Sequence, residues 1–407
     1  MTKERGDTGR QQSSAFSKFQ YLKDVFLCSL VAFGGPEAHL GVFLDRLVQK
    51  KNYLTEKALL EWMALCSFLP GPTSTQVITG IGLKKGGRSL ALLTLLVWAM
   101  PMIVLMGALS FLSPILGSDG ELPNWLAFLV PMAAGFVGWA AWQIGRKVVM
   151  NMLTFGLWAQ GFAVILVAKS PWAIPLILVS GAILSVILGK TEFKYEDEKR
   201  VNSKVPRGVF GLFLGLSLLS WLALQFSADS LVAGFERFYR FGYLVFGGGQ
   251  VVVPVMQSEL VDHAGLLTEE QFLSGFGLVQ ALPGPMFSFA AYVGGISETG
   301  HGNTRQVMGA LVSGLAIFLP GTLLLFVVFP VWEKIRRLDW AFKALSGLNA
   351  TAGGLVGGAL VAILIALEAQ ILPFVYFGMT LILLATRRVP APLIVVTLGI
   401  VSYFLSL

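Results

Sequence analysis

The stretch Phe68-Leu69-Pro70-Gly71-Pro72-Thr73-Ser74-Thr75-Gln76 decides how this chain folds. It lies inside an apolar run from residue 58 to residue 83, and its two prolines break any helix that enters it. Backbone groups freed at membrane depth are tolerated only where protein or a water-filled cavity satisfies them. A break that is followed by three hydroxyls and an amide therefore predicts a functional site.

The composition is that of a polytopic membrane protein. Of the 407 residues, 55% are hydrophobic and 13% are charged, whereas a soluble domain has about 25% charged residues. The formal net charge of +7 lies largely in loops, so it predicts membrane topology and not a nucleic-acid partner. Residues 1–19 are polar and have no apolar centre, so we expect a cytoplasmic tail and not a signal peptide.

The chain contains an internal duplication. A shift of 213 places residues 33–72 on residues 246–285 without a gap, and fifteen of these forty positions are identical. The second copy contains Ala281-Leu282-Pro283-Gly284-Pro285-Met286-Phe287-Ser288, which repeats the opening stretch. Further along, a shift of 219 places Pro101 on Pro320 and Gly135 on Gly354. Such a repeat must be recognised before any fold is assigned.

Loop charges predict that the two repeats have opposite orientations. Residues 45–61 carry one arginine and three lysines, whereas the matching residues 258–274 carry neither. The loop 113–124 has no basic residue, whereas its counterpart 331–343 has four. Because basic loops stay in the cytoplasm, equivalent loops are expected on opposite sides. The N-terminus is then cytoplasmic and the C-terminus periplasmic.

The predicted fold class is an all-α polytopic membrane protein with two inverted-topology repeats of about six helical elements each. The first repeat covers residues 20–189 and the second 227–407; a basic cytoplasmic loop at 190–207 and one extra transmembrane helix at 208–226 join them. Unbroken spans are expected at 89–113, 124–145, 149–168, 172–189, 306–330, 342–367, 370–386 and 390–406.

The broken elements are expected to be re-entrant. Loops 45–57 and 83–88 are both basic, so both should be cytoplasmic. The segment between them would then enter the membrane, bend at Pro70-Gly71-Pro72 and return to the same side. The alternative, in which every element crosses the membrane, stays open at this point.

Helix starts after the prolines predict an anion site that needs no basic side chain. Proline favours the first position of a helix, and the N–H groups and positive dipole end there attract anions. A kinked packing helix is the usual explanation of one such break, but two matched breaks favour a site. The candidate substrate-binding residues are Gly34, Gly35, Pro36, Gly71, Pro72, Thr73, Ser74, Thr75, Gln76, Gly248, Gly249, Gln250, Gly284, Pro285, Met286 and Ser288.

Three ionisable residues that follow Gly34-Gly35-Pro36 are further candidates for a functional role. Glu37 and His39 follow Gly34-Gly35-Pro36, and intramembrane ionisable groups are functional hypotheses by default. Glu37 is a candidate for carrying a coupling proton, although a first-turn carboxylate also stabilises its own helix; His39 is a second coupling candidate or a histidine at the membrane edge. Arg46 is a candidate for guiding an anion into the cytoplasmic mouth, or a simple topology residue.

Enzyme, metal and cofactor functions find no support in the sequence. The two cysteines, Cys28 and Cys66, lie in apolar runs and are expected to be buried thiols. The three histidines show no metal-ligand spacing, and the spans lack the carboxylates that a metal site needs. No catalytic triad, zinc-protease motif or phosphate-binding lysine motif occurs. We therefore expect no metal, no cofactor and no enzymatic activity.

These motifs resemble the chromate ion transporter family. The resemblance extends over about residues 20–400 and rests on Phe33-Gly34-Gly35-Pro36 with Ala38-His39, Leu69 to Gln76 with Gly82, Phe246-Gly247-Gly248-Gly249 with Val252-Val253-Pro254-Val255, and Pro283-Gly284-Pro285. It implies a two-domain member that exports chromate across the bacterial inner membrane and confers chromate resistance. The sequence departs from the family at Ser67, where an amide is common, while the second half keeps Gln280.

Several functional alternatives stay open beside chromate export. The substrate is expected to be a tetrahedral oxyanion, so sulfate or a related anion is an alternative cargo of a transporter, exchanger or antiporter. An anion channel would also use facing half-helices and would need no proton carrier. The expected partners are the oxyanion and the lipid bilayer, with a homodimer as one arrangement.

Overall fold

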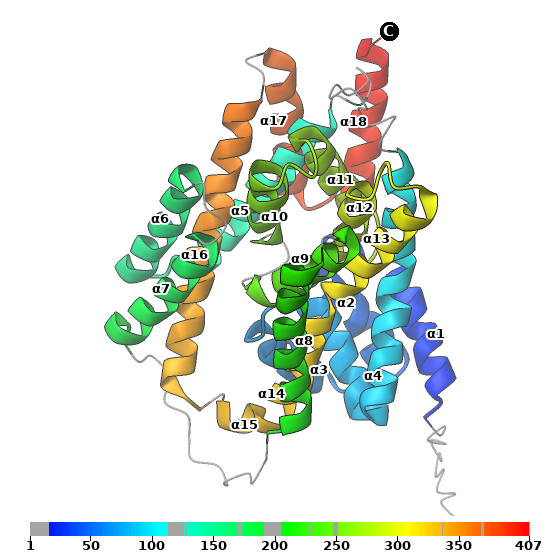
Figure 1. Ribbon diagram of the computed structural model, residues 1–407, viewed down its shortest axis with the longest axis vertical. Helices are drawn as coiled ribbons and strands as arrows, with labels where there is room; N and C mark the ends of the chain where they lie inside the picture. The colour runs from blue at the N-terminus through cyan, green and yellow to red at the C-terminus, as the bar shows by residue number, and fades with distance from the viewer. Residues whose placement is uncertain are drawn as a thin grey trace, which may run out of the picture.

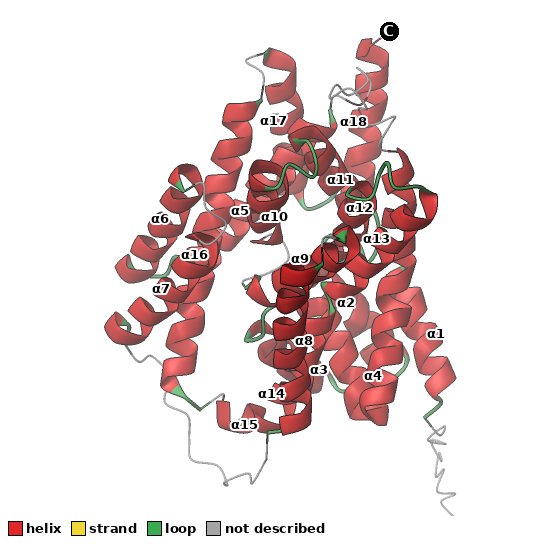
Figure 2. Ribbon diagram, viewed as in Figure 1, coloured by secondary structure: helices red, strands yellow, loops and turns green. Residues whose placement is uncertain are grey.

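The computed structural model describes most of the chain as helices. The described residues are 16–112, 126, 128–168, 173–190, 205–227, 229–246, 251–335, 337–367 and 370–406, with backbone alone for Pro36 and Glu37. All regular elements within these ranges are helical (Figures 1 and 2). The prediction of an all-α protein is confirmed for this part of the chain.

The first half runs from α1 to α7, and α8 follows it. Its helices are α1 (Lys18–Ser29), α2 (Pro36–Phe43), η1 (Leu44–Lys50), α3 (Glu56–Ser67), α4 (Thr73–Leu109), η2 (Ser110–Leu112), α5 (Leu129–Val148), α6 (Met152–Val167), α7 (Ala173–Leu188) and α8 (Arg207–Phe226).

The second half follows the same order. Its helices are α9 (Ser230–Leu244), α10 (Val252–Gln257), η5 (Ser258–His263), α11 (Glu269–Ala281), η6 (Met286–Ser288), α12 (Phe289–Ile296), α13 (Asn303–Ala316), α14 (Leu319–Val328), η7 (Phe329–Val331), α15 (Trp332–Ile335), α16 (Asp339–Ala366), α17 (Ile371–Thr386) and α18 (Ala391–Ser406). Both η1 and η5 are π-helices, a rare form, and they occupy matching places in the two halves.

Most predicted spans agree with the observed helices, and the one at 306–330 lies within the apolar segment Asn303–Ile335, which a short turn interrupts. The sequence predicted an unbroken span at 306–330, whereas the structure ends α13 at Ala316 and begins α14 at Leu319. The break lies just before Pro320, which has no N–H to donate and whose ring crowds the preceding turn. Its counterpart Pro101 lies inside the continuous α4, which bends instead at Gly86 and Gly87.

Several described helices are long and apolar enough to cross a membrane. Four reach this standard of length and hydropathy among the described residues, at Thr73–Leu112, Arg207–Phe226, Asn303–Ile335 and Asp339–Ala366. Shorter apolar helices are Met152–Val167, Ala173–Leu188, Met286–Ile296, Ile371–Thr386 and Ala391–Ser406. These apolar helices are what a membrane protein requires.

The two halves are interlaced through their long helices. α16 of the second half packs against α6 and α7 of the first, on the left of Figure 1. Gly354 lies against the Trp158 carbonyl, and Gly161 lies against the Thr351 carbonyl. In the reciprocal pairing α17 packs on α5, where Gly135 leaves room for Thr380. Small residues at these crossings allow close approach of the backbones, as is usual between membrane helices.

The interlacing is not symmetric at α3 and α11. α11 packs against α5 and α18, and its Gly277 lies against Met132 of α5. Leu273 on α11 is consequently 0% exposed, whereas its counterpart Leu60 on α3 is 53% exposed. Ser67 at the end of α3 is also exposed, whereas its counterpart Gln280 is buried. The face of α11 that carries Leu273 is therefore covered by other helices, whereas the matching face of α3 is uncovered.

Ion pairs tie the first helix of each half to its π-helix, with reversed charges. In the first half Asp24 lies 2.9 Å from Arg46. A shift of 213 places Asp24 on Arg237 and Arg46 on Glu259, and these two lie 3.8 Å apart. Arg240 strengthens the second pair, because its Nη2 lies 2.6 Å from the Glu259 carboxylate. The two copies therefore keep this ion pair at matching positions, but the positive and negative side chains have exchanged places.

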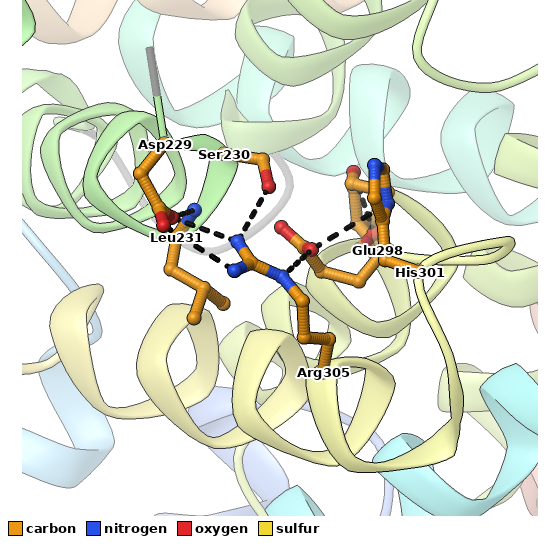
Figure 3. A network of polar contacts seen from close by, with 8 residues as sticks. Asp229, Ser230, Leu231, Glu298, His301 and Arg305 are labelled. Atoms are coloured by element: carbon orange, nitrogen blue, oxygen red, sulfur yellow. Dashed lines mark hydrogen bonds and ion pairs between the residues drawn. The ribbon is translucent and has the colours of Figure 1, made fainter. Parts of the chain in front are cut away.

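A second polar network holds the start of α9 to the α12–α13 connection (Figure 3). The Arg305 guanidinium contacts Asp229 at 2.8 Å and Glu298 at 3.1 Å, and it donates to the Ser230 hydroxyl. Arg305 also holds the pKa of the Asp229 carboxyl below its usual range. His301 lies 3.8 Å from Glu298 on the outer side of the network.

The first half makes the equivalent connection by different chemistry. The shift of 213 places Phe16 on Asp229 and Lys85 on Glu298. The Lys85 ammonium lies 5.6 Å from the centre of the Phe16 ring, a distance typical of a cation–π contact. In each half, therefore, the start of the first helix is held to the segment that follows the Pro-Gly-Pro turn and its next helix.

Removing Arg46 should destabilise the protein. Asp24 is fully buried and receives hydrogen bonds from Arg46 and from the Tyr53 hydroxyl. Arg46→Ala leaves this carboxylate without its main cation, so we expect a loss of about 3 kcal/mol and a lower melting temperature in detergent.

Lys50→Ala is the matched control for this prediction. Lys50 pairs with Asp45, but both side chains are more than half exposed, so its loss should cost less than about 1 kcal/mol. Equal melting temperatures for the two variants would contradict the structural role assigned to Arg46.

Candidate functional site

The first Pro-Gly-Pro forms a turn between two helices that meet inside the protein. α3 ends at Ser67 and α4 begins at Thr73, directly after Pro72, as the proline pattern predicted. Gly71 has a φ of +104°, and its N–H donates to the Val245 carbonyl at 2.8 Å. The acceptor lies in the other half of the chain, just before its own glycine-rich break.

The second Pro-Gly-Pro repeats this arrangement in reverse. Gly284 has a φ of +109°, and its N–H donates to the Ala32 carbonyl at 2.8 Å. The shift of 213 relates both donors and both acceptors, since it places Gly71 on Gly284 and Ala32 on Val245. Each half therefore supplies the acceptor that the turn of the other half needs.

Only glycine fits at the centre of each turn. A side chain is strained at such positive φ values. A Cβ on Gly71 would also lie 3.2 Å from the Gly242 carbonyl oxygen, and one on Gly284 would lie 3.2 Å from the Cβ of Met102. The close packing that surrounds both turns explains why these positions cannot carry a side chain.

The polar residues that follow the first turn are buried, and each forms a hydrogen bond with a neighbouring group. The Ser74 hydroxyl lies 2.9 Å from His39 Nδ1, and the Thr75 hydroxyl accepts from Trp98 Nε1 at 3.1 Å. Gln76 donates from Nε2 to the Pro70 carbonyl at 2.7 Å. The structure thus brings His39 to the first turn of α4, where its ring meets the predicted Ser74 hydroxyl.

Five buried polar atoms in the elements around the two turns have no hydrogen-bond partner among the described residues. They are the hydroxyl oxygens of Thr79, Ser274 and Ser288, the Oε1 atom of Gln76 and the Nε2 atom of His39. Buried polar groups in folded proteins are nearly always paired, so such atoms indicate a bound water or ligand. The three hydroxyls can donate to an anion, whereas Gln76 Oε1 only accepts and would suit a water or a proton.

The second half presents fewer polar groups at its turn. Ser288 is fully buried at the end of η6. The Gln280 amide lies 3.4 Å from the Met286 sulfur, so these two side chains contact each other beside the turn. The half-sites therefore differ: the first is rich in hydroxyl and amide groups, and the second is largely apolar.

The remaining predicted residues fall into three groups. Gly34 and Gly35 have φ values of +86° and +84° and lead into α2, which begins at Pro36 as predicted. Arg46 lies apart from the turns, in its ion pair with Asp24. The residues Gly248, Gly249 and Gln250 and the side chains of Pro36 and Glu37 lie outside the described part of the chain.

Sequence reasoning missed the contribution of Trp98. Tryptophans of membrane proteins usually lie at span ends, but Trp98 lies within α4 and is 0% exposed. It donates to Thr75 and packs edge-on against His39, with ring centres 5.4 Å apart. Its position in the middle of an apolar span was the available signal, because a buried indole N–H needs an acceptor.

Comparison with known proteins gives two matches to one family. The sequence profile described as "Chromate transporter" matches residues 19–186 and again residues 232–403. The same profile therefore matches each half of the chain once.

Named relatives span almost the whole chain. A probable chromate transport protein of Synechococcus elongatus is 26% identical over 95% of both chains. The chromate transport protein of Pseudomonas aeruginosa is 24% identical over 86% of this chain and 82% of its own. That of Cupriavidus metallidurans is 23% identical over 92% of this chain and 90% of its own.

No solved structure gave a significant match. The relatives are all named for transport, and the profile covers both halves of the chain that meet at the two Pro-Gly-Pro turns. This chain belongs to the chromate transporter family.

Proposed function

We propose that this protein is a secondary transporter that exports chromate from the cytoplasm across the inner membrane and thereby confers chromate resistance. The observation that carries the proposal is the paired turn. Two Pro-Gly-Pro turns, one from each copy of a chromate transporter unit, are hydrogen-bonded to opposite halves. Transport of sulfate or a related oxyanion, and conduction through an anion channel, are the alternatives.

The turns suit an oxyanion because helices begin at them. α4 starts at Thr73, and the first N–H groups of a helix have no intrahelical acceptor. Together with the positive end of the helix dipole they attract an anion without a buried basic side chain. The unpaired hydroxyls of Thr79 and Ser288 supply further donors. Glu37 stays the candidate for carrying a coupling proton.

Inverted topology is supported by two features of the contacts. The turn hydrogen bonds are exchanged reciprocally, Gly71 with Val245 and Gly284 with Ala32, as a two-fold axis in the membrane plane would require. The ion pair between α1 and η1 reverses its charges in the second half. In the proposed topology α8 turns the second repeat over, the N-terminus is cytoplasmic and the C-terminus periplasmic.

Helix lengths support the re-entrant arrangement. α3 has 12 residues and α11 has 13, so each rises about 18–20 Å at 1.5 Å per residue. The hydrocarbon core is about 30 Å thick. We infer that each of these helices enters the membrane only as far as its Pro-Gly-Pro turn, and that the following helix returns to the same side.

The difference between α3 and α11 supports alternating access. In a transporter with inverted repeats, the two halves exchange conformations when the site opens to the other side. α11 is covered by α5 and α18, whereas the matching face of α3 is uncovered. We interpret this state as open toward the α3 side, which is cytoplasmic in the proposed topology.

Chromate uptake into energised everted vesicles tests the proposed function. Because everted vesicles expose the cytoplasmic face, export should accumulate radiolabelled chromate inside them, and a protonophore should stop the accumulation. Excess sulfate should compete if both anions share the site. Vesicles that equilibrate chromate without concentrating it would favour the channel, and vesicles that move no chromate would reject the substrate.

Ser288→Ala should weaken chromate transport through affinity. The Ser288 hydroxyl is buried and has no partner among the described residues. A hydrogen bond to a charged ligand contributes about 1.5–3 kcal/mol, so KM should rise roughly tenfold or more. Ser297→Ala is the control, because its hydroxyl already donates to the Val293 carbonyl. Equal KM values for both variants would argue against the half-helix site.

Thiol labelling of a matched pair tests alternating access. In a Cys28→Ala/Cys66→Ala background, which removes two buried free thiols, Ser67→Cys should react rapidly with a maleimide in the resting protein. Its counterpart Gln280→Cys should be protected, because Gln280 is 8% exposed. A saturating gradient of chromate should reverse this order. Protection of Ser67→Cys under both conditions would contradict the interpretation.

A further inference from the structure

A cavity lies at one end of the molecule, apart from the Pro-Gly-Pro turns. It measures about 750 Å³ and is bounded by the end of α5, the start of α6, the end of α7 and the start of α16. These helices lie on the left of Figure 1. Since a water molecule takes about 30 Å³ in the liquid, the cavity has room for a polar ligand with part of its hydration shell.

Basic side chains line this cavity. Lys147, Lys190, Arg337 and Lys343 contribute cations, and Asp339 contributes a carboxylate that lies 2.8 Å from the Lys343 ammonium. Cations gathered around one partly enclosed space repel each other and lose hydration, so an anion between them lowers the free energy. Among the described lining residues, cationic side chains therefore outnumber carboxylates.

One further feature of the lining favours an anionic ligand. α6 begins at Met152 after the N-cap Asn151, so the positive end of its dipole faces this region. Asn349 also lines the cavity, and its buried Oδ1 has no hydrogen-bond partner in the described ranges. This oxygen only accepts hydrogen bonds, so it indicates a bound water that accompanies the ligand.

Two of the lining cations have no charged counterpart in the other copy. The shift of 219 places Lys147 on Ala366 and Lys343 on Asn124, neither of which is charged. Packing residues such as Gly135 and Gly354 are kept in both copies, whereas these cations are not. The cavity is therefore a feature of one end and not a by-product of the duplication.

An aromatic contact separates the cavity from the first turn. Phe342 lines the cavity and packs edge-on against Phe68, with ring centres 4.6 Å apart. Phe68 directly precedes Leu69-Pro70-Gly71-Pro72. This pair of rings lies between the lining of the cavity and the first turn.

We propose that this cavity is a second anion site, which binds a tetrahedral oxyanion group through Lys147, Lys190 and Arg337. The group has two sources, a free oxyanion or the phosphate of an anionic lipid. Met150, Met152 and Leu188 at the rim are 73%, 83% and 61% exposed, so acyl chains have an apolar surface to cover. Basic pockets between helix ends are typical sites for anionic headgroups. The site does not depend on the proposed export function.

Two probes and a matched pair of variants test the site. The purified protein is titrated with sulfate by calorimetry after delipidation, and its retention of phosphatidylglycerol is measured by native mass spectrometry. Lys147→Gln/Arg337→Gln should weaken binding of one probe about tenfold, the equivalent of about 1.4 kcal/mol. Lys50→Gln/Arg88→Gln removes the same charges elsewhere and should leave binding unchanged.

The probe that responds identifies the source of the anion. A loss of sulfate binding assigns a free oxyanion, and a loss of phosphatidylglycerol retention assigns a lipid headgroup. Lys190→Gln, which lies outside any helix, serves if the double variant does not fold. Equal binding of both probes by the cavity variant and the control would overturn the proposal.

Failure of this site is distinguishable from failure of the transport function. Ser288→Ala changes the turn and not the cavity, so it should alter chromate transport while leaving the cavity-dependent binding unchanged. If the protein transports no chromate but still binds a probe through Lys147 and Arg337, the proposed function is wrong and the proposed cavity site stands.

Discussion

A backbone N–H group in the interior of a membrane protein must find an acceptor, and two such groups determine how the halves of this chain meet. The Gly71 amide finds the Val245 carbonyl, and the Gly284 amide finds the Ala32 carbonyl. Each proline-broken turn frees backbone groups that its own helix cannot satisfy. The glycine-rich break of the opposite half meets that need, so two local defects become one central contact. The helix start at Thr73 and the polar residues around it depend on this contact for their position.

Much of the helical framework could be predicted because it follows from local rules. Apolar runs gave the spans near α5, α16 and α17, and Pro72 gave the start of α4. Contacts between distant segments could not be predicted in the same way. The split between α13 and α14 depends on how Pro320 packs, since Pro101 causes no break in α4. The pairing of Arg46 with Asp24 depends on tertiary structure. The sequence showed only the charge of Arg46, which led to the hypothesis that it guides an anion to the cytoplasmic mouth.

The two halves show how a duplicated unit can change while keeping its contacts. Trp62 on α3 covers Gly80 on α4, whereas in the second half Tyr292 on α12 covers Gly275 on α11. The large ring has moved from one arm of the hairpin to the other, and the small residue has moved with it. The same holds for the reversed ion pairs and for the network around Arg305 (Figure 3), where an aromatic contact in one half corresponds to a salt bridge in the other. Pairs of residues have changed together because the packing density leaves no room for one to change alone.

The exchanged hydrogen bonds have an evolutionary consequence. Each repeat has a donor at its turn and an acceptor at its break, and in this structure both are paired with the other repeat. In the proposed inverted topology, an ancestral single repeat would have needed a partner inserted upside down in the same membrane. In that topology α8 would join the two orientations in one polypeptide, so that every molecule would carry one of each. Fusion then freed each copy to specialise, which is how one turn could become polar while its twin kept a methionine and a lone serine.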